Sequence, residues 1–364
     1  MAETTAATGL TVQQWDDKFF TEHLAENRFA REMGSDANSI IQVKEDLTRK
    51  QGDSVTYALV NKLTGAGVEN GATLEGNEEE MNSRSYKLTI KERANGVRST
   101  SWDAQISSID LRRAAKEVLK DWAMEDTRDR IITALGSING VAYGSASEAQ
   151  KDAWLADNAD RVLFGAAKSN NSSNDHSASL ANIDNTADKL DTGALSLLKR
   201  MARTANPKIR PVRDTGLRNG KYYYTAYVPS LVFRDLKSDA AIQQAQREVS
   251  IQMENSRLFE GGDLLWDGII IKEIEDIGVI SGAGAAGIDV APVYLCGAQA
   301  LGYGVASRWK SEEELFDYKR KKGCAIMEMG GIEKLIFGTN SSTDTGDTKD
   351  HGLVTGYFAS VADS

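Results

Sequence analysis

The chain has 364 residues, of which 41% are hydrophobic and 26% charged, so it is long and apolar enough to build one large core or two smaller ones. Its formal net charge of −10 argues against a protein that wraps nucleic acid, because neutralising phosphates requires clustered Lys and Arg. Two cysteines, Cys296 and Cys324, cannot form a disulfide framework and favour a reducing cytoplasm. The sequence shows no signal peptide and no run of about 18 apolar residues, so we expect no membrane segment.

The N-terminal region predicts an extended arm. Residues 11–33 carry apolar side chains, among them Trp15, Phe19 and Phe20, on a polar background ahead of any convincing core segment. We therefore expect these three aromatic residues to contact something outside their own segment.

A long β-hairpin follows. Residues 53–60 are rich in β-branched and aromatic residues, and 85–93 alternate apolar with polar side chains, Tyr86 being one of the apolar ones. The segment 63–98 has few apolar groups. Fixing its backbone costs about 1–2 kcal/mol of conformational free energy per residue. Burying its few apolar side chains returns about 2 kcal/mol each, which is too little to offset that cost. We therefore expect it to be disordered or to be ordered by another surface. On the second interpretation, Tyr86 is a candidate contact with an adjacent copy of the chain.

Residues 107–137 have the apolar spacing of a very long amphipathic helix, roughly 40 Å at 1.5 Å per residue. Ser107 or Ser108 is the expected N-cap, and Gly136 the expected stop. Truncating Trp122 to Ala is expected to cost about 3–5 kcal/mol, as for a buried aromatic residue. The expected core stripe of this helix consists of Leu111, Ala115, Val118 and Trp122.

The remaining chain predicts a mixed α+β fold. A shorter amphipathic helix is expected at 192–205 and another helix at 239–249. Strands are expected at 220–236 and at 264–280, and the segments 291–306, 308–338 and 352–362 complete the mixed α+β chain. Two polar runs, 166–190 and 338–352, interrupt this pattern as insertions.

No motif for catalysis, a cofactor or a metal ion stands out. The glycine-rich stretch 282–287 follows a strand, but the residues after it are β-like rather than the start of a helix, which favours a turn over a dinucleotide site. His23, His176 and His351 lie far apart, without zinc-ligand spacing or a nucleophile elbow. We therefore expect no enzyme.

Two charged runs are candidates for contacts between copies of the chain. Glu78, Glu79 and Glu80 are consecutive, so their carboxylates fan outward and lack the alternation of a calcium loop. The basic run at 318–323 contains Lys321 and Lys322, which could meet these glutamates on a neighbouring copy.

Six motifs, in the same order along the chain, resemble the tailed-bacteriophage major capsid proteins with the Hong Kong 97 type of fold, in the branch annotated after a short-tailed enteric phage. They are "VKEDLTRKQGDSVTYALVNKLTG", "TLEGNEEEM", "DLRRAAKEVLKDWAMEDTRDRIITAL", "YYYTAYVPSLVFRDLKSD", "LWDGIIIKEIED" and "EEELFDYKRKKGCAIMEMGG".

The resemblance implies an organisation that the residues alone do not give. It implies an N-terminal arm (1–50), an extended loop with flanking strands (51–106), a spine helix of the peripheral domain (107–140), a mainly axial domain with the 166–190 insertion (141–300), returning peripheral strands (301–340) and a C-terminal segment (341–364). The lysine, asparagine and glutamate that crosslink some relatives cannot be located here.

The resemblance also implies a function: a structural protein, assembled in the host cytoplasm, that forms hexamers and pentamers of an icosahedral shell around double-stranded DNA. Scaffolding, portal and cement or decoration proteins would be further partners, and the long hairpin would be ordered on an adjacent copy. Deleting 68–84 should then leave a soluble monomer. The alternatives are an encapsulin-like compartment, a minor decorating protein and a cytoplasmic metal-dependent hydrolase.

Overall fold

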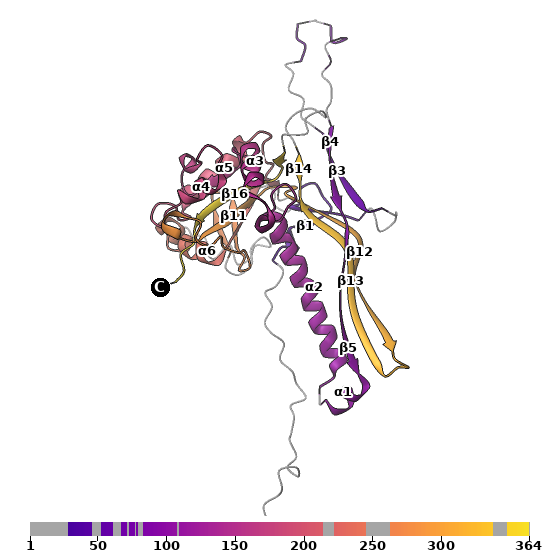
Figure 1. The fold of residues 1–364 in the computed structure, drawn as a ribbon. Helices are drawn as coiled ribbons and strands as arrows, with labels where there is room; N and C mark the ends of the chain where they lie inside the picture. Colours follow the sequence, from indigo (N-terminus) through magenta and orange to yellow (C-terminus); the bar gives the residue numbers. More distant parts are fainter. Residues whose placement is uncertain are drawn as a thin grey trace, which may run out of the picture. The chain divides into compact units, whose positions relative to one another are not determined.

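The computed structural model describes residues 28–45, 52–60, 67–70, 73–76, 78, 83–107, 109–213, 222–244, 263–337 and 348–363. These residues form two compact units, which we treat separately. Unit 1 contains 92–127 and 307–329, and unit 2 contains 28–91, 128–306 and 330–363. Figure 1 labels helix α2 (Leu111–Leu135) and strands β12 (Leu301–Phe316) and β13 (Lys321–Lys334). The residue ranges of these three elements extend over both units.

A mixed seven-stranded sheet is the main element of unit 2. The strand order is β6-β16-β11-β8-β10-β9, with β7 paired to β8. Strand β16 runs parallel to β6 and antiparallel to β11, and β10 runs parallel to β8. The strands are β6 (Val162–Phe164), β7 (Val212–Arg213), β8 (Tyr222–Val228), β9 (Leu264–Trp266), β10 (Ile269–Glu273), β11 (Val290–Cys296) and β16 (Leu353–Ala359).

Both faces of this sheet are buried, which explains its nearly continuous apolar strands. In β8, Tyr224 and Ala226 join the core that contains α5 (Thr192–Thr204) and α6 (Ser230–Lys237), whereas Tyr227 joins the core that contains the end of α2. This alternation follows from the period of two residues in a strand. A third core packs α3 (Glu148–Asp157) and α4 (His176–Ala181) against β6 and β16.

Helices α3, α4 and α5 begin at side chains that cap their N-termini. Asp191 accepts a hydrogen bond from the Ala194 amide at the start of α5, and Ser147 and Gln150 form a capping box at α3. The polar run 166–190 is folded, since the buried Asp188 carboxylate accepts hydrogen bonds from Ala166, Asn170 and Asp184 within it.

Short 3-10 turns occur at Ala30–Glu32, Tyr143–Ser145, Lys168–Asn170 and Ala285–Gly287.

A second sheet, of five strands, has the order β1-β2-β12-β13-β5. Its additional strands are β1 (Met33–Gly34), β2 (Ile41–Lys44) and β5 (Lys91–Thr100). Helix α1 (Ser101–Ile106) follows β5 directly. Two smaller pairs are the antiparallel hairpin of β3 (Ser54–Val60) with β4 (Ser83–Thr89), and β14 (Ile336–Phe337) with β15 (Lys349–Asp350).

Most predicted elements are confirmed. The strands expected at 53–60 and 85–93 are β3 and β4 with the start of β5, and the long helix is α2, about 38 Å in length at 1.5 Å per residue. It ends directly before Gly136, as expected. Its N-terminus differs, because the Asp110 carboxylate accepts from the amides of Arg112 and Arg113, while Ser107 ends α1.

The strand expected at 220–236 is correct only in its first half. After β8 the chain forms α6, because Pro229 starts the helix and Val232, Phe233 and Leu236 have helical spacing and fill the core. Residues 240–244 of the expected second helix are helical. No helix in the described ranges is long and apolar enough to cross a membrane.

Candidate functional site

The base of the β3–β4 hairpin is docked within unit 2. Val55 and Tyr57 of β3 and Leu88 of β4 pack with Leu335 and Phe337 in a small separate core. Each of these five side chains is at most 5% exposed. The hairpin therefore has an anchor of its own, and it does not depend on another copy at this end.

Glycines on the long strands allow this close contact. A Cβ added to Gly302 would lie 2.9 Å from the Tyr57 ring. One added to Gly331 would lie 2.2 Å from the carbonyl oxygen of Thr89, closer than real Cβ atoms come. A side chain at either position would push the hairpin away from the sheet. Small residues in β12 and β13 are thus part of how the hairpin is positioned.

The expectation for 63–98 is therefore wrong for residues 83–98. That part is ordered by its own chain, because β4 pairs with β3 and β5 pairs with β13. Tyr86 is half-buried, and its hydroxyl donates a 2.8 Å hydrogen bond to Glu333 of the same chain. Burial and this bond raise the pKa of Tyr86. Its predicted role as a contact between copies stays a prediction.

The far end of the hairpin is described only in short pieces. Glu78 is exposed, and its carboxylate accepts a 2.7 Å hydrogen bond from the Gly76 amide. Glu79 and Glu80 lie outside the described residues, as do Trp15, Phe19 and Phe20.

In unit 1, one face of the β5–β13–β12 sheet packs against α2. Trp122 meets Trp309 edge to face with ring centroids 5.8 Å apart, and the indole nitrogen of Trp309 lies 3.3 Å from the Thr127 hydroxyl oxygen, to which it donates a hydrogen bond. Arg93 of β5 pairs with Asp126 at 3.5 Å. These contacts show that odd-numbered residues of β12 and β5 turn toward the helix.

Glu313 of β12 connects the β5–β13–β12 sheet to the first turns of α2. Its carboxylate lies 2.5 Å from the Arg112 guanidinium and also contacts the Lys116 ammonium. The hydrogen bonds from Lys116 and then Arg112 lower the pKa of Glu313. The carboxylate therefore stays ionised and holds both cations on one side of the sheet.

The predicted core stripe of α2 is wrong at Val118, which is 51% exposed. Leu111, Ala115 and Trp122 are only partly buried, while the buried positions of this part of the helix are Leu119 and Ala123. The real stripe is displaced by one residue, because the opposing side chains of β12 and β5 select it.

Unit 1 exposes a large share of its apolar side chains. Trp102 of α1 is 71% exposed and Tyr318, in the turn between β12 and β13, is 100% exposed. Most of the strongly exposed large apolar side chains in the described ranges belong to this unit: Val97, Trp102, Ile106, Val118, Met124, Leu315, Tyr318 and Met329. Such clustering marks surfaces that contact other molecules.

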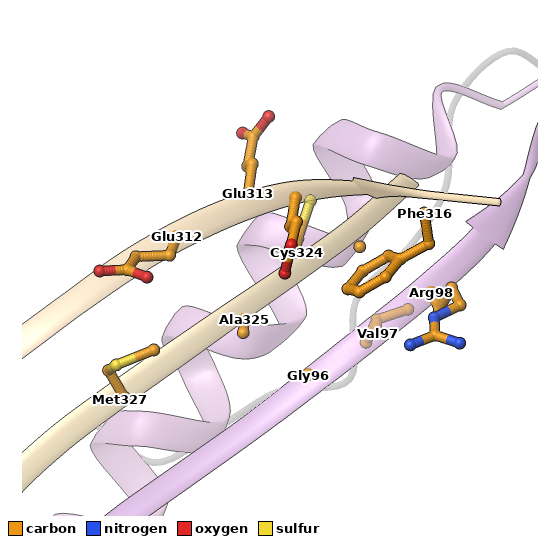
Figure 2. A pocket seen from close by; sticks show the side chains of 11 residues that line it. Gly96, Val97, Arg98, Glu312, Glu313, Phe316, Cys324, Ala325 and Met327 are labelled. Carbon is orange, nitrogen blue, oxygen red and sulfur yellow. The ribbon is translucent and has the colours of Figure 1, made fainter. Parts of the chain in front are cut away.

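On the face of the sheet opposite α2 there is a groove of about 580 Å³ (Figure 2). The Arg98 guanidinium lies over the Phe316 ring, 4.2 Å from its centroid, at one end. Glu312 and Glu314 alternate with the helix-facing Glu313. The groove is lined by Gly96, Val97, Arg98, Glu312, Glu313, Glu314, Phe316, Gly323, Cys324, Ala325 and Met327.

The candidates for other chemistry have structural roles. The stretch 282–287 ends in a one-turn 3-10 helix and leads into β11, which confirms the expected turn. Glu148, Asp152 and Asp175 lie close together, but Asp175 caps α4, Asp152 accepts the His176 amide and Glu148 faces the His176 ring. Cys296 and Cys324 are buried free thiols.

Comparison with known proteins agrees with this reading of the fold. The sequence profile of the family described as phage capsid protein matches residues 3–362. The major capsid protein of Pseudomonas phage KPP25 is 29% identical over 349 residues, 90% of this chain and 89% of that one. The capsid of cyanophage Pam1 superimposes with a TM-score of 0.86 at 32% identity, and that of Ralstonia phage GP4 with 0.78 at 19%, each over 100% of both chains.

The fold is thus that of a tailed-phage capsid protein of the Hong Kong 97 type. The chain belongs to the phage capsid protein family. It is a major capsid protein of the virion, a structural protein rather than an enzyme, and copies of it form the icosahedral shell of a phage head. This decides among the alternatives of capsid, decorating protein, encapsulin-like compartment and hydrolase.

Proposed function

We propose that copies of this chain form hexamers and pentamers that close around double-stranded DNA without sequence-specific contacts. The net charge of −10 supports this arrangement, since an acidic shell holds its genome by enclosure rather than by tight binding. Scaffolding, portal and cement or decoration proteins are the further partners proposed for such a head.

The exposed apolar surface of unit 1 is the observation that carries this proposal. A side chain such as Trp102 or Tyr318 gains little by facing water, whereas aromatic residues are enriched where proteins meet. Specific interfaces bury roughly 800 Å² per partner, and repeated modest contacts add up in a closed shell.

We further propose roles for the parts of the chain. Residues 1–50 are the arm, 51–106 include the extended loop, 107–140 hold the spine helix and 301–340 the returning strands of the peripheral domain. The axial domain includes 141–300. Strand β16 belongs with it as well, since it pairs with both β6 and β11.

The contacts proposed between copies join the far end of the hairpin to an adjacent subunit. Glu78, Glu79 and Glu80 would meet Lys321 and Lys322, while Trp15, Phe19 and Phe20 would cover apolar surface of a neighbour. Glu78 and Lys322 are exposed, and the Lys321 ammonium has only a loose 3.6 Å contact with Asp317 of its own chain. The supply of exposed opposite charges supports this pairing.

Deletion of 68–82 tests the role of the hairpin. Because β4 begins at Ser83, this deletion spares the docked base that a cut extending to 84 would damage. The variant should remain folded, as judged by circular dichroism, but should sediment as small species and show no shells in electron microscopy. Normal shells would contradict the proposal.

Charge reversal tests the glutamates separately. Changing residues 78–80 from Glu to Lys should hinder assembly, whereas the control Glu275→Lys, at an exposed position of unit 2, should not. Assembly that is equally efficient in both variants would remove the proposed pairing. Particles purified from infected cells should contain nuclease-protected double-stranded DNA, and empty or protein-filled particles would contradict the enclosure of a genome.

A further inference from the structure

The turn between β12 and β13 presents two side chains in an unusual backbone conformation. Asp317, Tyr318 and Lys319 have φ values of 53°, 52° and 70°, in the left-handed region that residues other than glycine seldom adopt. Hydrogen bonds fix the turn, since the Arg320 amide donates to the Asp317 carbonyl and the Ser101 amide donates to the Arg320 carbonyl. These hydrogen bonds therefore fix the backbone that presents the exposed Tyr318 ring to solvent.

Neither presented side chain is buried or paired by the residues that the structure describes. The Tyr318 ring is completely exposed, so it does not fold back into the groove of its own copy. Lys319 is exposed, and no ion pair forms between it and any residue in the described ranges. Backbone strain that presents an aromatic ring and a free cation suggests a contact outside the copy.

The groove on the face of the sheet opposite α2 offers the matching chemistry. Phe316 and Met327 supply apolar and polarisable surface, and the small Ala325 side chain between them leaves space in the groove (Figure 2). Its volume of about 580 Å³ is within the range of ligand pockets and larger than one aromatic side chain needs.

The rim of the groove is acidic on the β12 side. Glu313 is taken up by Arg112 and Lys116 of α2, but Glu312 and Glu314 form no ion pair within the described ranges. Arg98, the cation at the opposite end, already lies over the Phe316 ring. The free charge at the groove is therefore negative and complements Lys319.

We infer that Tyr318 and Lys319 of one copy dock into this groove of a second copy, the ring against Phe316 and Met327 and the ammonium toward Glu312 and Glu314. Donor and acceptor are different surfaces of the same unit, so the contact is heterologous and can close a ring of copies. This inference rests on the proposed assembly, and it leaves Lys321 and Lys322 available to the hairpin.

Photocrosslinking tests the contact directly. Full-length chain with p-benzoylphenylalanine in place of Tyr318 would be mixed with unmodified, nitrogen-15-labelled chain, assembled and irradiated. Mass spectrometry should map crosslinks to Met327 or its neighbours in the labelled copy. Crosslinks confined to the modified copy, or to residues outside the groove, would overturn the inference.

Charge reversal gives an independent test with a rescue. Lys319→Glu should raise the concentration needed for assembly by about tenfold or more, since a repelled ion pair costs at least what a tenfold change in binding represents. Adding Glu312→Lys and Glu314→Lys should restore assembly. The matched control Lys310→Glu, at an exposed cation of β12 that does not line the groove, should have little effect.

The outcomes separate this inference from the proposed function. If the unmodified chain forms no shells, the proposed assembly itself fails. If shells form but Lys319→Glu assembles like the control, or the triple reversal does not rescue it, only the groove contact is wrong.

Discussion

The two units of this chain differ in how far their apolar side chains are buried. In unit 2 the central strands β8, β10, β11 and β16 are buried on both faces, and three large cores fill the space around them. In unit 1 residues 92–98 of β5 are exposed, and α1 and the β12–β13 turn present aromatic rings to solvent.

This difference indicates where each unit gains its stability. Unit 2 buries enough apolar surface to be stable within one copy, because each large buried side chain contributes about 1.5–3 kcal/mol. Unit 1 is held by a thin layer of contacts between α2 and the sheet, and its outer surface keeps side chains such as Trp102 and Tyr318 exposed. A shell protein benefits from both, since a subunit must fold alone and yet remain incomplete until it assembles.

The largest expected effect tests the interior of unit 2. Lys334 and Asp350, both almost completely buried, lie 2.9 Å apart, and the Trp154 indole nitrogen donates to the same carboxylate oxygen at 3.2 Å. Lys334→Met should cost about 3–5 kcal/mol in the free energy of unfolding, because it leaves a buried carboxylate without its cation.

The control for this variant is Lys199→Met. Lys199 pairs with Asp267 at 2.7 Å, but Asp267 is half exposed, so the loss should be at most about 1 kcal/mol. Urea denaturation of the unassembled chain measures both. Equal losses would show that the Lys334–Asp350 pair is no better shielded from water than the half-exposed Lys199–Asp267 pair.

A second prediction concerns pH. Burial, with a smaller effect of Arg161 and Arg210, lowers the pKa of His351 to about 4. The unfolded chain takes up a proton near pH 6.5 and the folded chain does not, so stability is full above that pH and falls by about 1.4 kcal/mol per pH unit down to about pH 4. About 3 kcal/mol should be lost in this window.

His351→Phe isolates this contribution. The ring of residue 351 packs edge to face on Phe337 at 5.2 Å, a contact that phenylalanine keeps. Stability at pH 7 should change little, while the decline toward pH 4 should become shallower than in the unmodified chain. The pKa of His176 is also lowered by burial, so the difference between the two chains is the quantity to compare. Identical slopes would refute the assignment to His351.

The smallest effects are expected in unit 1. Trp122 is half-buried against Trp309, so Trp122→Ala should cost about 2 kcal/mol rather than the 3–5 expected from the sequence. Val118→Ala, on the exposed side of the same helix, should stay within about 0.5 kcal/mol. Denaturation curves in which Val118 matters as much as Trp122 would mean that α2 is rotated from the orientation described.

The features that could be predicted from the sequence are those that a local residue pattern determines. The length of α2 and its stop at Gly136, the alternation in β4 and the turn at 282–287 all follow from periodicity and turn chemistry. The stripe of α2 did not, because apolar residues at 118, 119, 122 and 123 fit two neighbouring helix faces. Only the opposing strands β5 and β12 decide between them, and β12 lies almost 200 residues later in the chain.

The groove of unit 1 could not be predicted from the sequence either. Its walls come from β5, β12 and β13, so no single segment carries a pattern for it. The signals that could have pointed to it are the alternation of Glu312 and Glu314 with Glu313, and the apolar residues 315, 316 and 318 in an otherwise charged stretch. The docked hairpin base depends on Gly302 and Gly331, whose spatial neighbours are also distant in sequence.

The position of β16 has a consequence for biosynthesis. This strand, Leu353–Ala359, occupies the place between β6 and β11, and until it arrives the two flanking strands have no common neighbour. The ribosome must therefore make residue 359 before the sheet can close, and a nascent chain cannot present a finished subunit. Translation itself delays the supply of competent building blocks, which keeps growing particles from incorporating half-made ones.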